Sequence, residues 1–304
     1  MTDAEPELAV GRIAAFHGRP IDGVEPLQNA VQIAIDSGVL DLGYEAAWLL
    51  GVCHSSAGHY GSALAVLGPL ARDSSSWSPA SPERPHFSAL AATTIASVYR
   101  QLSMHTQAQP KDEWALNRSG DDPIATFDAW LGLAADFVGR GDSVRASQAW
   151  RRAQAEAATD EWRQQVRLGW VEAEIALMTD RPHDAVAASV RVVEVARRAE
   201  APRHVAKSLL FAGVSALGVE PDQGMTWLTQ AAQGAEALGA LPLVWPSRAV
   251  LADTCRDPWQ AKAHRSAAAT AIEQILSGLP PALAAMWRTR PEVAANLDSS
   301  NPNE

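Results

Sequence analysis

Residues 125–156 read ATFDAWLGLAADFVGRGDSVRASQAWRRAQAE and predict two antiparallel helices joined by a tight turn. Trp130 and Ala134 lie on one face at helical spacing in the first half, and Ala146 and Trp150 do so in the second half. Between the two halves, the tetrapeptide GRGD interrupts the apolar pattern with turn-forming residues. This stretch therefore predicts one helical hairpin.

The same hairpin recurs along the chain at a nearly constant interval. Small residues mark the second helix of each unit at intervals of 38 to 45 residues, and a second series runs twelve residues ahead of the first. The first series is Gly23, Ala63, Ala108, Ala146, Ala185, Gly224 and Ala263, and the second is Gly11, Gly51, Ala96, Ala134, Ala173, Ala212 and Leu251. A fixed period of this size is typical of repeat arrays, in which each unit stacks on the one before.

Turn chemistry follows the same phase. The segments between the two helices of other units read HGRPID, SAGHYG, LSMHTQ, TDRPHD, GVEPDQ and CRDPWQ. Pro20, Pro182 and Pro221 occupy equivalent places, where we expect each to begin a second helix because a missing N–H costs little in the first turn. A Ser/Pro-rich loop at 74–85 accounts for the one long interval and carries Trp77, and it is either a tolerated surface loop or a flap over the groove.

Composition narrows the class of protein. The chain has 304 residues, of which 47% are hydrophobic, and a net charge of −10, which argues against direct binding of nucleic acid. Cys53 and Cys255 imply no disulfide framework, and the acidic N-terminus lacks the features of a signal peptide. No apolar run approaches the ~20 residues that a membrane span needs. We therefore expect a cytoplasmic protein that does not bind membranes.

The repeats resemble those of the tetratricopeptide repeat (TPR) family. The stretch LLGVCHSSAGHYGSALAVL matches the TPR pattern at Leu50, Gly51, Gly58, Tyr60, Ala63 and Leu67, and the repeat at 127–158 matches it at Trp130, Ala134, Phe137, Gly141, Ala146 and Trp150. The repeats around Ala173 and Ala212 match weakly. The resemblance implies an all-α, right-handed superhelical solenoid of about seven TPR-like helix-turn-helix repeats over residues 1–278.

The interval exceeds the standard TPR length of about 34 residues. Longer repeats are similar to the superhelical arms of MalT-like bacterial regulators, and ILSGLPPALAAMWRTRPEV resembles the segment that often closes such arms. We expect residues 279–297 to form one C-terminal capping helix that covers the final repeat, and residues 298–304 to be a disordered tail. The ATPase module that precedes such arms has no counterpart in this sequence.

Motifs for catalysis or metal binding are missing from the sequence. There is no GxxxxGK[ST], GxGxxG or HExxH, so we predict a protein that is not an enzyme and that needs no cofactor. CHSSAGH brings Cys53, His54 and His59 close together, but a zinc site needs a fourth ligand, and packing explains these residues better. We predict neither catalytic nor metal-ligating residues.

The resemblance places the partner-binding surface on the first helix of each hairpin, which lines the concave side of a TPR superhelix. Register carried over from the family points to the groove residues Trp48, Ser97, Arg100, Gln101, Arg167, Trp170 and Glu174, together with Glu45, Val52, Ser55 and Thr93. Large aromatic and Arg side chains usually carry binding energy in such grooves. The alternative is that neighbouring helices bury both Trp rings. The register gives a groove of mixed polarity, without the dense Lys/Arg clamp that grips acidic C-termini.

Two functions follow from this interpretation. The first is a protein-interaction scaffold or regulatory adaptor that binds another protein, as a peptide or helix, in the concave groove. The alternative is a small-ligand-sensing regulatory arm that acts on a transcription or signalling partner. Self-association as a homo-oligomer remains open beside both.

Overall fold

The chain folds into helices that pair with their neighbours in sequence. The computed structural model describes residues 4–71 and 85–298, and these two ranges contain helices and turns but no strand. The loop at 74–85 lies outside the described residues except for its last residue, Pro85, which begins a helix. Of the predicted tail at 298–304, residues 299–304 also lie outside them, and Asp298 belongs to the last helix instead of the tail.

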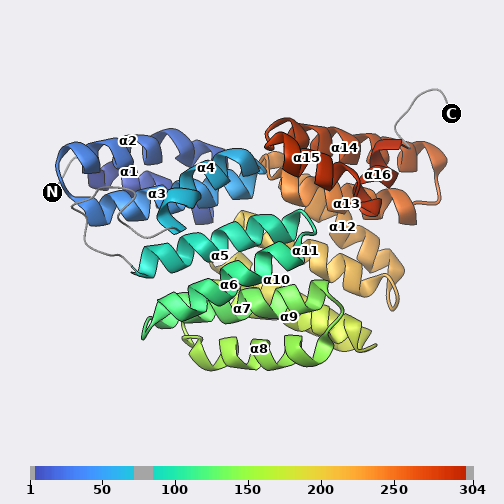
Figure 1. The fold of residues 1–304 in the computed structure, drawn as a ribbon. Coiled ribbons are helices and arrows are strands. Elements are labelled where there is room, and N and C mark those ends of the chain that lie inside the picture. The colour runs from blue at the N-terminus through green and yellow to red at the C-terminus, as the bar shows by residue number, and fades with distance from the viewer. Residues whose placement is uncertain (1–3, 72–84, 299–304) are drawn as a thin grey trace.

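Seven helical hairpins make up the array, as expected for a right-handed superhelix of TPR-like units. They are α1 (Ala4–His17) with α2 (Val24–Asp36), α3 (Leu40–Ala57) with α4 (Tyr60–Ala71), α5 (Pro85–Gln101) with α6 (His105–Ser119), α7 (Pro123–Gly139) with α8 (Ser143–Glu156), α9 (Trp162–Met178) with α10 (Pro182–Arg198), α11 (Pro202–Ala216) with α12 (Pro221–Ala237), and α13 (Leu241–Thr254) with α14 (Pro258–Ser277). Figure 1 shows the pairs stacked side by side.

Local sequence explains where these helices begin and end. The Asp122 side chain accepts hydrogen bonds from the backbone N–H groups of Ile124 and Ala125 and caps α7, where Pro123 takes the first position. Gly58 ends α3 at a φ of 92°, in the left-handed region that glycine tolerates. Pro20 differs from the prediction because it begins a short 3-10 turn, η1 (Pro20–Gly23), and α2 starts only at Val24.

The small residues of the repeat allow close helix crossings. Ala63, Ala108, Ala146 and Ala185 are completely buried. In the sixth hairpin, a Cβ atom on Gly224 would lie 2.9 Å from the carbonyl oxygen of Gly213, so that crossing requires glycine. The last hairpin departs from the pattern, because Ala263 is exposed. The buried face of α14 begins further along, at Ala268 and Ala269.

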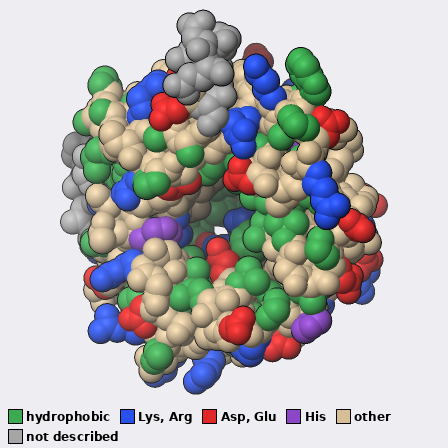
Figure 2. Space-filling view, turned by 90° about the vertical axis from the view of Figure 1, so that its right-hand side faces the viewer, with side chains coloured by type: hydrophobic (Ala, Val, Ile, Leu, Met, Phe, Trp, Pro, Cys, Tyr) green, Lys and Arg blue, Asp and Glu red, His purple; other side chains and the backbone are tan. Residues whose placement is uncertain are grey.

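The array curves until its two halves meet. Helix α1 contacts α11, and α3 contacts α13. His17 Nδ1 lies 3.0 Å from the carbonyl oxygen of Ala199, and the guanidinium of Arg163 stacks 4.2 Å from the centroid of the Phe16 ring. Figure 2 shows the resulting hollow at the middle of the molecule, with acidic and basic side chains around it. The concave face is therefore the inside of a ring rather than an open groove.

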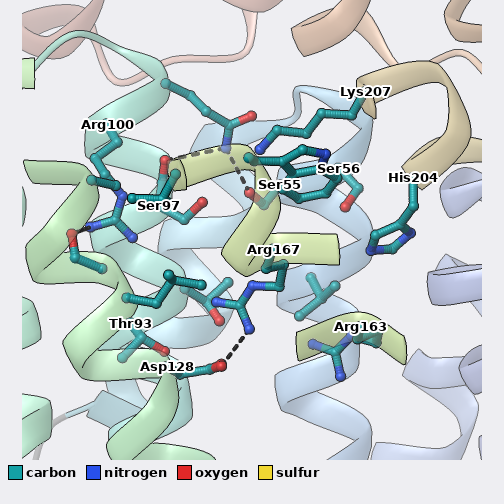
Figure 3. A pocket seen from close by; sticks show the side chains of 18 of the residues that line it. Ser55, Ser56, Thr93, Ser97, Arg100, Asp128, Arg163, Arg167, His204 and Lys207 are labelled. Carbon is teal, nitrogen blue, oxygen red and sulfur yellow. Dashed lines mark hydrogen bonds and ion pairs between the residues drawn. The ribbon is translucent and has the colours of Figure 1, made fainter. Parts of the chain in front are cut away.

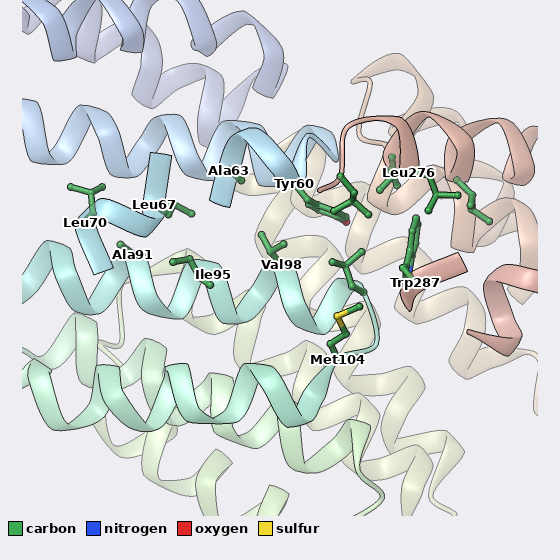
Figure 4. Packing of buried hydrophobic residues seen from close by; sticks show 14 of the residues in the cluster. Tyr60, Ala63, Leu67, Leu70, Ala91, Ile95, Val98, Met104, Leu276 and Trp287 are labelled. Atoms are coloured by element: carbon green, nitrogen blue, oxygen red, sulfur yellow. The ribbon is translucent and has the colours of Figure 1, made fainter. Parts of the chain in front are cut away.

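The C-terminal cap strengthens this closure. Residues 279–297 contain two short helices, α15 (Pro281–Arg288) and α16 (Pro291–Asp298), and not the single helix we expected. Pro291 begins the second of them because its fixed φ suits the first turn of a helix. The cap also covers more than the final repeat. Trp287 is completely buried in one apolar cluster with Tyr60 and Met104, which belong to early hairpins (Figure 4).

The described helices include none that is both long and apolar enough to cross a bilayer.

Candidate functional site

A cavity of about 320 Å³ lies inside the ring. Its walls come from the first helices of six successive hairpins, namely α1, α3, α5, α7, α9 and α11, with His105 added from the start of α6. We call it the central cavity. It is lined by Ala15, Phe16, Trp48, Val52, Ser55, Ser56, Thr93, Thr94, Ser97, Arg100, Gln101, His105, Asp128, Leu131, Gly132, Ala135, Arg163, Arg167, Trp170, Val171, Glu174, Arg203, His204, Lys207 and Phe211. Figure 3 shows many of these side chains pointing into the same space from different helices.

The structure brings the seven predicted groove residues together in this cavity. Trp48, Ser97, Arg100, Gln101, Arg167, Trp170 and Glu174 all line it, as do Val52, Ser55 and Thr93. Glu45 does not, because its carboxylate turns outward to Arg12 Nε at 2.7 Å. One register thus placed ten of these eleven side chains on a common wall, and whether they bind a partner stays a prediction.

Arg100 is held by buried carboxylates behind the cavity wall. Its guanidinium pairs with Asp112 and lies 3.3 Å from Asp136, and the side chains of both aspartates are completely inaccessible to solvent. Burial raises the pKa of Asp112 well above its usual range, against the opposing effect of Arg100. A side chain on Gly132 would overlap the Asp112 carboxylate, so glycine makes room for this ion pair. Arg100 is therefore largely neutralised within the fold.

Arg167 and Trp170 show how α9 contributes to the wall. Arg167 pairs with Asp128 of α7. Trp170 is only 7% exposed, and its indole N–H donates to the Ser208 hydroxyl at 2.9 Å. Trp48 is half-buried, and its indole N–H lies 3.2 Å from Thr94 Oγ1. Neighbouring helices thus bury Trp170 more than they bury Trp48, and both rings remain part of the cavity wall.

Gln101 occupies the middle of a polar chain on α5. Its amide oxygen accepts a hydrogen bond from the Tyr60 hydroxyl at 3.3 Å, and its amide nitrogen donates to Ser55 Oγ at 3.4 Å and to the Ser97 carbonyl at 3.2 Å. This chain links the second hairpin to the third and fixes the position of the Gln101 side chain.

The groove positions taken from the TPR family missed three basic residues of the wall, which are Arg163, Arg203 and Lys207. Arg163 and Arg167 of α9 recur 40 residues later as Arg203 and Lys207 of α11, so the repeat period itself carries the signal. The predicted groove residues include none on α11. The expectation of a groove without a dense set of Lys and Arg is wrong, since five basic side chains line this cavity against the two acidic ones, Asp128 and Glu174.

The missed residues carry charge in a desolvated place. Burial lowers the pKa of Arg163 and of Arg203 to about 10 each, and it lowers the pKa of Lys207 to about 7, with repulsion from Arg203 adding to the effect. Burial also raises the pKa of Glu174, while the charge of Lys207 opposes that rise. The wall thus holds a surplus of positive charge that the low dielectric strengthens.

The sequence CHSSAGH forms part of the core and not a metal centre in this structure. Cys53 is completely buried among apolar side chains, and burial raises its pKa to about 12. His54 is buried beside it, with its ring centroid 6.0 Å from that of His59. In the described part of the chain, no three His, Cys, Asp or Glu side chains are grouped as metal ligands would be.

Comparisons with known proteins show the fold. No protein-family model matches the chain, and no curated protein matches it in sequence. Among solved structures, it is similar to a Rap protein in complex with Competence and Sporulation Factor, with a TM-score of 0.59 and 12% identity over 97% of this chain and 80% of the other. It is also similar to a signal-transduction ATPase with numerous domains and a tetratricopeptide repeat sensor from Pyrococcus horikoshii. That match has a TM-score of 0.52 and 13% identity, and it covers 91% of this chain and 42% of the other.

The fold and the cavity together define the class of protein. The chain is a TPR-like superhelical solenoid, closed into a ring around a cavity that the first helices of its repeats enclose.

Proposed function

We propose that this protein is a regulatory binding module that takes a short peptide segment of a partner into the central cavity. The observation that carries the proposal is the convergence of α1, α3, α5, α7, α9 and α11 on one space inside the ring. Its volume of about 320 Å³ falls at the lower end of the range for small-ligand sites. A ring interior of this size suits an extended peptide end better than the helix that an open groove would accept.

The chemistry of the wall supports a peptide. Aromatic rings from Trp48, Phe16 and Phe211 offer apolar contact, and Ser97, Thr93 and Gln101 offer hydrogen bonds to a main chain. A few convergent polar groups among apolar ones are characteristic of specific binding sites. The Rap protein to which the fold is similar was solved with Competence and Sporulation Factor bound, which agrees with a ligand-binding role for such a fold.

A small-ligand-sensing arm is the second candidate, and ring closure favours it. The contacts that close the ring on α1 rest on few side chains, because His17 meets the Ala199 carbonyl at the end of α10 and Phe16 meets Arg163 of α9. A ligand that bound both halves of the wall would stabilise the closed ring, and this change in curvature would reach a partner on the outer surface. The tetratricopeptide repeat sensor in the second similar structure is in line with this idea.

The experiment is native mass spectrometry of the purified protein after incubation with the low-mass fraction, below about 3 kDa, of an extract from the source cell. Ser97→Phe fills the cavity from α5, whereas Val144→Phe adds the same ring at an exposed position on α8. We expect an adduct on the wild type and on Val144→Phe that is absent from Ser97→Phe. A peptide mass supports the first candidate, and a metabolite mass supports the second. No adduct on the wild type, or the same adduct on both variants, contradicts a ligand site in the cavity.

A further inference from the structure

Part of the positive charge of the central cavity has no ion-pair partner among the described residues. Of the five basic side chains, Arg100 is paired with Asp112 and Asp136, and Arg167 is paired with Asp128. Arg163, Arg203 and Lys207 make no ion pair with any carboxylate in the described part of the chain. One acidic side chain of the wall, Glu174, is left to balance three cations.

Hydrogen bonding is also incomplete at two of these residues. The Nε atoms of Arg163 and Arg203 are buried and have no hydrogen-bond partner among the described residues. Arg163 instead stacks on the Phe16 ring, and Lys207 Nζ lies 4.1 Å from the centroid of the Trp170 ring. Stacking on rings holds these side chains in place and leaves their donors free to face the cavity.

Basic side chains without ion-pair partners in the cavity wall lower the stability of the folded protein. Charges that are partly removed from water are normally paired, because an unpaired one loses hydration without gaining a partner. The whole chain has a net charge of −10, and yet no carboxylate of the described residues forms an ion pair with these three side chains. The surface of the protein is acidic while the wall of its cavity is basic. This contrast points to a counterion that arrives from outside.

We propose that Arg163, Arg203 and Lys207 form a seat for an oxyanion, a carboxylate or phosphate group carried by the ligand. Arg163 of α9 and Arg203 of α11 lie one repeat apart, Lys207 follows one turn later on α11, and all three line the same cavity. Figure 3 shows Arg163 and Lys207 at its wall. Guanidinium groups match the planar geometry of such oxyanions with paired N–H donors, and an ammonium group adds a point charge. This proposal rests on the proposed function and names the chemical class of its ligand.

The test is thermal unfolding in sodium phosphate, in sodium acetate and in sodium chloride at equal ionic strength. Binding to the folded state raises the melting temperature in proportion to the logarithm of ligand concentration. We expect phosphate, acetate or both to raise it above the value in chloride, and which of them does so distinguishes the two oxyanions. The variants Arg163→Met and Arg203→Met are expected to lose this rise and to melt at a higher temperature than the wild type in chloride.

Arg151→Met is the matched control, because Arg151 is exposed on α8 and its change removes the same charge outside the cavity. It should keep the wild-type response to the oxyanions. Equal melting temperatures of the wild type in all three salts would overturn the proposal, and so would an equal loss of the response in Arg151→Met and Arg203→Met.

The extract experiment separates this proposal from the proposed function. An adduct that survives in both Arg163→Met and Arg203→Met leaves the cavity as a ligand site and removes the oxyanion seat. A phosphate or acetate response without any adduct from the extract supports the seat and contradicts the proposed function.

Discussion

Lys207 Nζ lies 4.1 Å from the centroid of the Trp170 ring, within the wall of the central cavity. The same indole donates to Ser208, and it stacks against His204 and Phe211 at centroid distances of 5.7 and 6.1 Å. One residue of α9 thus connects the fifth hairpin to the sixth and also holds a cation that faces the ligand space. This position serves packing and, in our proposal, ligand binding.

Replacement of Trp170 therefore tests two roles at once. We expect Trp170→Ala to lower the free energy of unfolding by about 3 kcal/mol, because it empties a buried ring site. Trp170→Phe keeps an aromatic face for Lys207 but loses the donor to Ser208, and should cost about 1 kcal/mol. Urea unfolding of both variants measures the difference. Equal stability of Trp170→Ala and the wild type would show that the indole does not join the two hairpins.

The buried ion pair of Arg100 gives a second prediction. Arg100→Met leaves the carboxylates of Asp112 and Asp136 buried without a cation, so we expect a loss of about 3–5 kcal/mol near neutral pH. Burial already raises the pKa of Asp112, and a group whose pKa is raised by folding favours the folded state at low pH and loses that contribution as pH rises. The loss should therefore be smaller at pH 5 than at pH 8.

A double variant provides the control for this pair. Arg100→Met combined with Asp112→Asn removes one of the stranded charges and should recover part of the lost stability. If the double variant is no more stable than Arg100→Met, the stranded carboxylate is not the source of the loss.

Lys207 predicts a further dependence on pH. Burial lowers its pKa to about 7, and the charged groups that act on it are Arg203, Glu174, Arg167 and Arg100. In the unfolded chain, Lys207 keeps its proton up to a pH of about 10. The charge on Lys207 in the folded state therefore lowers the free energy of unfolding most below pH 7, and this loss fades as pH rises toward 10. We expect Lys207→Met to be more stable than the wild type at pH 6.5, and the difference to shrink at pH 9.5. Denaturant unfolding at the two values measures it. A constant difference would contradict a lowered pKa at Lys207.

Closure of the ring can be tested at Gly61. A Cβ atom there would overlap the carbonyl oxygen of Gly278, which lies between α14 and α15. We expect Gly61→Ala to cost about 1–3 kcal/mol and to speed hydrogen exchange of the backbone in residues 279–297. Gly218→Ala is the control, because nothing lies within 4 Å of a Cβ atom at that position. Exchange in the cap that is equally slow in both variants would show that the cap does not depend on this contact.

Much of this architecture could be predicted from local sequence. Each hairpin could be predicted from its small residues, such as the completely buried Ala146 and Ala185, and from its caps and prolines. This is because helix crossings and turns depend on a few neighbouring residues. Ring closure could not be predicted in this way. The rotation of each hairpin against the next is small, and the contact of α1 with α11 depends on the sum of many rotations.

The same reasoning separates the predicted wall from the missed part of it. Trp48 and Arg167 follow from the TPR register, and Glu45 fails because its partner on another helix, Arg12, was not visible in the pattern. Arg203 lines the wall from α11, and the contact of α11 with α1, which closes the ring, could not be predicted from the pattern of one repeat. Pairing of Arg100 with Asp112 links α5 to α6, which a count of charges along one helix does not reveal.

The most direct measurement is a crystal structure of the protein grown with the low-mass fraction of the cell extract. The account predicts density inside the ring, with an oxyanion in contact with Arg163 and Arg203 and a chain or molecule extending toward Ser97 and Trp48. A ligand bound on the outer surface, with the interior filled by solvent alone, would contradict it.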